Sequence, residues 1–161
     1  MADWDRPDGL REYVAVHHDR LFRYSVLLTG ERTLAEDLSQ EVFARVGNKL
    51  QGVKQDRMWP YLRQAATNLW RNSLRRRSIE RRAQVRLTPV EVEDEGDRIV
   101  IPDEVWSAIA HLPAKQRISV VLRFYEDLTI NEIASAMRCP EGTVKSNLHR
   151  ALKRLREELE R

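Results

Sequence analysis

The chain has little of what catalytic and metal-binding proteins usually display. It holds one cysteine among its 161 residues, which excludes an internal disulfide. It contains no Cys/His spacing typical of a metal site, no glycine-rich phosphate loop and no nucleophile motif. His17 and His18 are adjacent, so they cannot share one helix face. The protein is therefore not expected to be an enzyme, and no catalytic residue, metal ligand or cofactor is assigned.

Long apolar runs are also missing. No segment is long and apolar enough to span a bilayer, and the opening segment from Met1 to Asp8 is polar and mildly acidic, unlike a signal peptide. Charged residues make up 33% of the chain, with a net charge of +3. These features predict a small cytoplasmic protein that makes no membrane contact of its own.

Charge is distributed unevenly along the sequence. Between residues 71 and 86 there are seven arginines against one acidic residue, and between residues 91 and 104 there are seven acidic residues against one arginine. The acidic part lacks helical periodicity and carries Pro and Gly, as linkers do. The sequence predicts an all-α protein of two small helical domains, at about residues 8–84 and 102–160, joined by a flexible acidic linker at 85–101.

Apolar residues recur at helical spacing in the N-terminal domain. One helix is expected from Leu10 to Leu28 and a second from about Thr33 to Val46. A third should begin near Pro60, which suits a first helical turn, and continue into the arginine tract. Trp59 and Trp70 lie at helical spacing and are expected in the core rather than at a DNA-melting surface.

A helix-turn-helix pattern occupies residues 128–156. Thr129 and Glu132 have the spacing of a capping box at a helix start, and the segment from Arg138 to Gly142 supplies turn residues before a second helix. The apolar residues of that second helix are expected to face a core; they are Val144, Leu148, Leu152, Leu155 and Leu159. Its other face carries side chains suited to DNA, namely Lys145, Ser146, His149, Arg150 and Lys153.

This stretch resembles region 4 of bacterial sigma factors, which binds the promoter's −35 element as duplex DNA. The segments from Leu112 to Arg117 and from Leu122 to Leu128 match the LPxxQR and LRxxxxL pattern that leads into that domain. The resemblance implies −35 base and backbone contacts by Lys145, Ser146, His149 and Arg150, and phosphate contacts by Thr143 and Lys153. It also implies the β flap of RNA polymerase as a partner.

The segment from Ala35 to Phe43 resembles sigma region 2.2, which docks on the β′ clamp helices of core RNA polymerase. The resemblance implies a docking patch of Asp37, Gln40 and Glu41, where acidic charge would steer a basic partner. Aromatic residues and arginines interleave further along, as a track for single-stranded DNA requires. The expected −10 single-strand contacts are Asn68, Arg71, Asn72, Arg75, Arg76 and Arg77. This segment resembles regions 2.3 and 2.4, and the residue matching Asn72 lies in the family's pocket for a flipped −10 base.

Region 2, a short linker and region 4 follow one another with no region 3 domain between them, which resembles the extracytoplasmic-function (ECF) sigma factors of the sigma-70 family. The resemblance implies a protein that directs core RNA polymerase to specific promoters and helps open them, with an anti-sigma factor as a further partner. It also implies that the acidic linker runs through the RNA exit path. The alternative is a stand-alone dimeric helix-turn-helix repressor or activator, which would bind a palindromic duplex tightly without polymerase.

Overall fold

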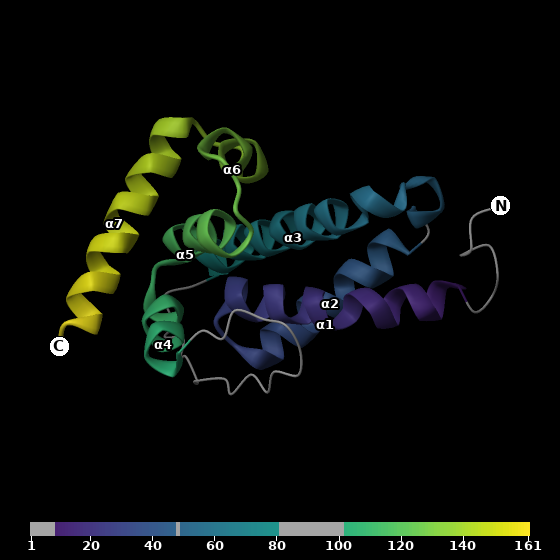
Figure 1. The fold of residues 1–161 in the computed structure, drawn as a ribbon, viewed down its shortest axis with the longest axis horizontal. Helices are drawn as coiled ribbons and strands as arrows, with labels where there is room; N and C mark the ends of the chain where they lie inside the picture. Colours follow the sequence, from purple (N-terminus) through teal and green to yellow (C-terminus); the bar gives the residue numbers. More distant parts are fainter. Residues whose placement is uncertain (1–8, 48, 81–101) are drawn as a thin grey trace.

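The computed structural model describes residues 9–47, 49–80 and 102–161, which form seven α-helices and no strand (Figure 1). The N-terminal domain contains α1 (Gly9–Thr29), α2 (Arg32–Val46) and α3 (Met58–Glu80), with the short 3-10 turns η2 (Leu50–Gly52) and η3 (Gln55–Arg57) between α2 and α3. The C-terminal domain contains α4 (Asp103–His111), α5 (Ala114–Val120), the π-helical turn η4 (Val121–Tyr125), α6 (Ile130–Met137) and α7 (Glu141–Leu159). The predicted all-α class is confirmed. The acidic linker lies outside the described residues.

The first two helices are joined by a tight turn. Gly30 has a φ of 72°, a left-handed conformation that glycine adopts without steric cost. The Thr29 hydroxyl donates a hydrogen bond of 2.8 Å to the carbonyl of Ser25, which closes the last turn of α1. Helix α2 then packs back against α1 and buries Ala35, Leu38 and Val42.

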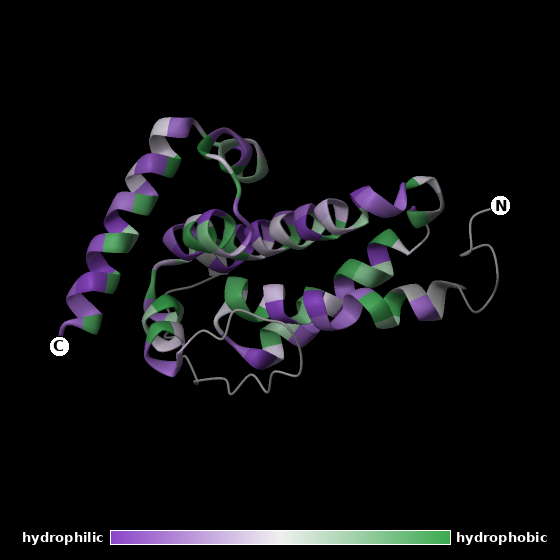
Figure 2. Cartoon of the chain, in the orientation of Figure 1, coloured by the Kyte–Doolittle hydropathy of each residue, from purple (hydrophilic) through white to green (hydrophobic). Residues whose placement is uncertain are grey.

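Aromatic residues fill the core of the N-terminal domain. Tyr24 is fully buried, its hydroxyl lies 2.8 Å from that of Thr67, and its ring meets Trp59 edge to face at 5.7 Å. Burial raises the pKa of the Tyr24 phenol well above its usual range, so the group stays neutral. Trp59 and Trp70 are 7% and 4% exposed, which confirms their expected place in the core. Each helix turns its apolar side inward (Figure 2).

One expectation about α7 is wrong. Val144 and Leu148 are buried and Leu155 is partly buried, but Leu152 and Leu159 are 43% and 47% exposed. The buried position between Leu148 and Leu155 is Ala151, because a stripe that advances by four, three and four residues passes through Ala151. Leu152 and Leu159 therefore lie beside the buried stripe rather than on it.

A buried arginine joins the two domains. Arg117 on α5 is 5% exposed, and its Nε donates to the carbonyl of Leu28 at the end of α1 over 2.9 Å. Its Nη1 donates to the carbonyls of Ala110 (2.8 Å) and Leu112 (3.4 Å) at the end of α4. Burial lowers the pKa of the guanidinium to about 10, still well above neutral pH. A cation thus meets the negative ends of two helices from different domains. A Cβ at Gly30 would lie 3.1 Å from Nη1 of Arg117, so this close approach also favours glycine.

A buried carboxylate makes the second polar contact between the domains. Glu126 follows η4, and its side chain is 4% exposed. Its Oε2 accepts hydrogen bonds from Nε1 of Trp59 (2.9 Å) and from Nη1 of Arg63 (3.0 Å), both in the N-terminal domain. Arg20 of α1 lies over the Trp59 ring at 4.1 Å from its centroid. The two domains therefore share a specific, hydrogen-bonded interface.

Candidate functional site

The expected docking residues lie together on α2. Asp37, Gln40 and Glu41 are spaced by three and one and are all exposed, on the side opposite Leu38 and Val42. Glu41 forms an ion pair of 2.6 Å with Arg45, one helical turn away. The structure thus places an acidic and amide-bearing patch, the α2 patch (Asp37, Gln40, Glu41), on open surface. Its role in docking stays a prediction.

The helix-turn-helix has the local geometry that its sequence predicts. Thr129 Oγ1 accepts from the backbone N–H of Glu132 at 3.2 Å, and Glu132 Oε2 accepts from the backbone N–H of Thr129 at 2.7 Å, which completes the capping box. These hydrogen bonds lower the pKa of the Glu132 carboxyl. Arg138 ends α6 in a left-handed conformation with a φ of 52°. Cys139 then donates its N–H to the carbonyl of Ala134, and Pro140 leads into α7.

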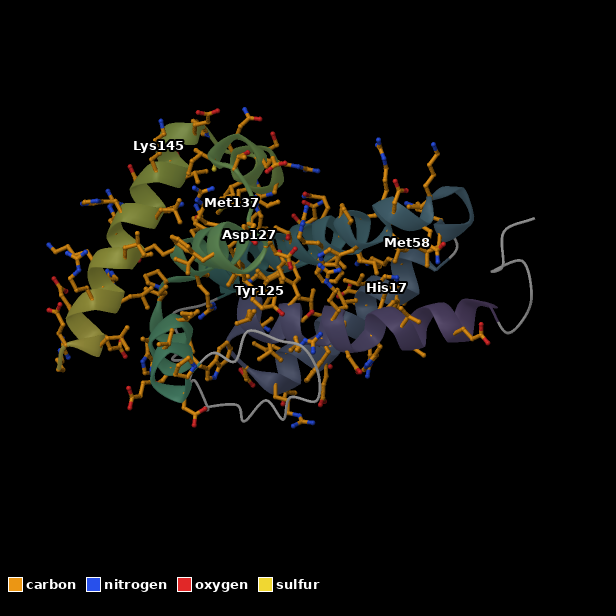
Figure 3. The ribbon with its side chains drawn as sticks, viewed as in Figure 1. His17, Met58, Tyr125, Asp127, Met137 and Lys145 are labelled. Atoms are coloured by element: carbon orange, nitrogen blue, oxygen red, sulfur yellow. The ribbon has the colours of Figure 1, made fainter. Side chains whose placement is uncertain are left out.

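The six residues expected to contact −35 DNA are exposed along α7. They form the α7 face: Thr143, Lys145, Ser146, His149, Arg150 and Lys153. The buried stripe of Val144, Leu148 and Ala151 anchors the opposite side of the helix against α5 and α6. Figure 3 shows Lys145 projecting from the end of α7 that lies beside α6. The face is basic and accessible, as a helix that enters a major groove requires.

The six residues expected to contact −10 DNA do not form one surface. Asn68, Arg71 and Arg75 follow one line along α3; Asn68 and Arg71 are partly buried on the side of the C-terminal domain, and Arg75 is exposed at the edge of that side. Asn72 and Arg76 are exposed at positions off this line, and Arg77 lies over the Trp70 ring at 5.4 Å. The structure therefore divides the expected strand-binding residues into an inner group and an outer group.

The inner group meets the helix-turn-helix. Gln64 Nε2 donates to Oδ1 of Asn68 (2.9 Å) and to the carbonyl of Ala136 on α6 (3.3 Å). Arg71 and Arg75 line a cavity of about 630 Å³ together with Thr143, the first residue of the α7 face. Burial, and then the charges of Arg138 and Arg75, lowers the pKa of the Arg71 guanidinium. Residues expected to bind separate promoter elements thus border one cavity.

Sequence reasoning missed the polar residues of the domain contact. Arg63, Arg117 and Glu126 carry charge, and periodicity places charged residues at the surface. Arg117 and Glu126 lie in the segments that precede the helix-turn-helix, but nothing in a single sequence marks them as buried. Among the described residues, no cluster of three or more His, Cys, Asp and Glu side chains is arranged to hold a metal ion. No described helix is long and apolar enough to cross a membrane.

Comparison with known proteins assigns both domains to described protein families. Residues 13–79 match the family model described as Sigma-70 region 2, and residues 103–155 match that of Sigma-70, region 4. These ranges contain the α2 patch, the six α3 residues and the α7 face. In solved structures, the chain resembles the sigma factor RpoE crystallised with the anti-sigma factor NepR from Bartonella quintana. The TM-score is 0.71 at 20% identity, over 95% of this chain and 98% of that one. This structural similarity shows that the two chains share the same fold.

Two curated relatives are similar over most of both chains. The RNA polymerase sigma-E factor of Streptomyces antibioticus is 37% identical over 150 residues, which cover 92% of this chain and 83% of the relative. The ECF RNA polymerase sigma factor SigL of Mycobacterium tuberculosis (strain Erdman) is 32% identical over 152 residues, which cover 87% and 82%. With both region models matched in order, the chain belongs to the ECF group of the sigma-70 family of RNA polymerase sigma factors.

Proposed function

We propose that this sigma factor binds −35 duplex through the α7 face and −10 single strand through the α3 residues, and thereby directs core RNA polymerase to a specific set of promoters. The observation that carries the proposal is the α7 face, where six polar or basic side chains are exposed opposite a buried apolar stripe. Such a helix can donate hydrogen bonds to base edges and phosphates at once. The stand-alone dimeric regulator is not favoured, because both sigma region models match.

The α2 patch supports the polymerase half of the proposal. Its side chains are exposed and acidic or amide-bearing, and charge complementarity with a basic helix would give fast and correctly oriented docking. We assign Asp37, Gln40 and Glu41 to the β′ clamp helices and the C-terminal domain to the β flap. An anti-sigma factor is the expected inhibitory partner.

Binding energy alone would drive promoter opening, so we assign the chain no catalytic step. It would act in the cytoplasm, where polymerase and DNA are found.

We propose domain limits of 8–84 and 102–160, with residues 85–101 as the acidic linker. The residues matched by the two region models, 13–79 and 103–155, fall inside these two domains.

Transcription on genomic DNA tests the proposal directly. Purified core RNA polymerase is incubated with fragmented DNA of the source organism, with and without this protein, and new RNA 5′ ends are mapped. We expect new starts that share −35 and −10 elements. Tight binding to palindromic duplex sites without polymerase, and no new starts, would establish the stand-alone regulator instead.

Arg150→Ala is expected to weaken −35 recognition by about 1 to 3 kcal/mol if Arg150 contacts a base edge. The side chain is exposed on the α7 face, so its removal should leave the fold unchanged. Binding of the polymerase holoenzyme is measured on the mapped promoter and on variants of its −35 element. An equal loss on every sequence would reassign Arg150 to a phosphate. Arg161→Ala removes the same charge at an exposed position beyond the end of α7 and is the matched control.

A further inference from the structure

A cavity lined by cations lies between α3, α5 and the helix-turn-helix. Its volume is about 630 Å³. The cationic residues that line it are Arg71, Arg75, Lys115 and Arg138, and none of the described residues that line it is acidic. Charges of one sign around a concave space reinforce one another's potential and raise the local concentration of ions of the opposite sign. The cavity is therefore suited to an anion.

The electrostatics of Arg71 show how concentrated this charge is. Burial lowers the pKa of its guanidinium, and the charges of Arg138 and Arg75 lower it further. Like charges held close together disfavour the charged form of each group. An anion bound among these side chains would offset their repulsion, so the cavity gains electrostatic stabilisation when negative charge fills it.

Two amide side chains at the cavity lack hydrogen-bond partners. Gln116 is 8% exposed, and its Oε1 is buried with no donor among the described residues. Nδ2 of Asn147 on α7 is also buried and has no acceptor among the described residues. Unsatisfied buried polar groups are few in native structures, and a bound ion or ligand is one explanation for them. Here one amide requires a donor and the other requires an acceptor.

The size and the walls of the cavity indicate more than an inorganic ion. Pockets for small molecules usually measure about 300–1,000 Å³, which is more than a single phosphate group fills. Apolar residues complete the lining, namely Leu74, Pro113, Ala114, Ile118 and Met137. We propose that this cavity binds a small organic phosphate of nucleotide size. Its phosphates contact the cations and Asn147, its body lies against the apolar residues, and a hydroxyl or amino group donates to Gln116.

A ligand in this cavity would compete with promoter DNA. Arg71 is assigned to the −10 strand, and Thr143, which also lines the cavity, is assigned to a −35 phosphate. A guanidinium that pairs with a ligand phosphate cannot pair with a DNA phosphate at the same time. The ligand would therefore lower the affinity of the chain for DNA, and promoter use would respond to its concentration. This consequence rests on the proposed function, whereas the site itself does not.

Isothermal titration calorimetry on the full chain tests the site. ADP is the probe, because it combines phosphates with a planar body and with amino and hydroxyl donors; pyrophosphate and adenosine represent its two parts. The titrations are made without Mg²⁺ at about 0.15 M salt, which screens exposed charges beyond about 8 Å. We expect ADP to bind about tenfold more tightly than pyrophosphate, because its body is buried, and adenosine to bind more weakly than either. Equal affinities for ADP and pyrophosphate would overturn the assignment to an organic phosphate.

Neutralising two cations shows whether ADP binds in the cavity. Arg71→Gln with Lys115→Gln should weaken ADP binding about tenfold or more, since one charge-assisted hydrogen bond is worth about a factor of ten. Arg57→Gln with Lys54→Gln is the matched control, because it makes the same changes at exposed positions that do not line the cavity. Equal losses in the two double variants would mean that ADP follows the net charge of the chain, which would overturn the site.

Ala114→Phe fills the cavity and keeps every cation. Ala114 is the first residue of α5 and lines the cavity, so the larger side chain should weaken ADP binding about as much as the loss of the two cations. Circular dichroism checks that the helices are retained. Anisotropy of a fluorescein-labelled single-stranded DNA then measures the competition: ADP should displace the DNA from the unmodified chain and not from Ala114→Phe.

The outcomes separate the site from the proposed function. If ADP does not bind, or binds folded Ala114→Phe as tightly as the unmodified chain, the site is overturned. If ADP binds in the cavity but does not displace DNA, the assignment of Arg71 to the −10 strand is wrong and the site is supported.

Discussion

Charge reversal at Asp37 and Glu41 together is expected to abolish binding to core RNA polymerase and to leave the free energy of unfolding nearly unchanged. Both side chains are exposed on α2, and the ion pair that would be lost among the described residues, Glu41 with Arg45, is worth about 0.3–0.5 kcal/mol. Two lysines facing a basic partner helix would place like charges together, which costs several kcal/mol. The affinity should therefore fall by about a hundredfold or more.

The binding is measured by titrating labelled core polymerase with the full chain, and the stability by urea unfolding. Glu12→Lys with Glu160→Lys makes the same total change of charge at exposed positions outside the α2 patch. This control should bind polymerase with nearly unchanged affinity. Equal losses in the two double variants would mean that net charge, rather than the α2 patch, governs binding.

Arg117→Met is expected to lower the free energy of unfolding by about 3 kcal/mol or more. The substitution leaves the carbonyls of Leu28, Ala110 and Leu112 without their shared donor, and each unsatisfied buried group costs about 1–3 kcal/mol. The substitution also removes the cost of burying a charged guanidinium, which offsets part of this loss of stability. The net change should nevertheless be a large decrease in the free energy of unfolding, because three carbonyl acceptors at two helix ends depend on one guanidinium.

Urea unfolding followed by circular dichroism measures this effect. Arg123→Met is the matched control, since Arg123 is exposed and donates one hydrogen bond, to the carbonyl of Leu128. It should cost about 1 kcal/mol. Arg117→Lys keeps a cation but not the planar fork of donors, so it should fall between the two. If Arg117→Met lowers the free energy of unfolding no more than Arg123→Met does, water must donate the hydrogen bonds that the Arg117 guanidinium made.

Local signals in the sequence predict most of the secondary structure. The capping box of Thr129 and Glu132 forms as expected, and the third helix begins at Met58, two residues before Pro60. Such signals work because they depend on neighbours within one or two turns. The error at Leu152 has the same origin: spacing by four places it near the apolar stripe, and only the packing of α7 shows that Ala151 takes the buried position.

The contact between domains is not local and could not be predicted in this way. Glu126 bonds residues that precede it by 67 and 63 positions, and Arg117 bonds Leu28, 89 positions earlier. A charged residue is buried only where partners satisfy it, and those partners are known only from the fold. The sequence could therefore propose the α2 patch and the α7 face, which lie on single helices. It could not foresee that Arg71 borders the same cavity as Thr143.

The position of Trp59 gives this sigma factor an optical reporter of its own. The Arg20 guanidinium lies over the indole, the ring of Tyr24 meets it edge to face, and the indole N–H donates a hydrogen bond to a carboxylate of the other domain. Loss of this contact would remove the carboxylate and admit water to the indole edge, so the fluorescence of Trp59 should then shift to longer wavelength. A change at the domain contact on binding of polymerase or DNA could thus be followed in real time on the unlabelled protein, with Trp59→Phe to identify the signal.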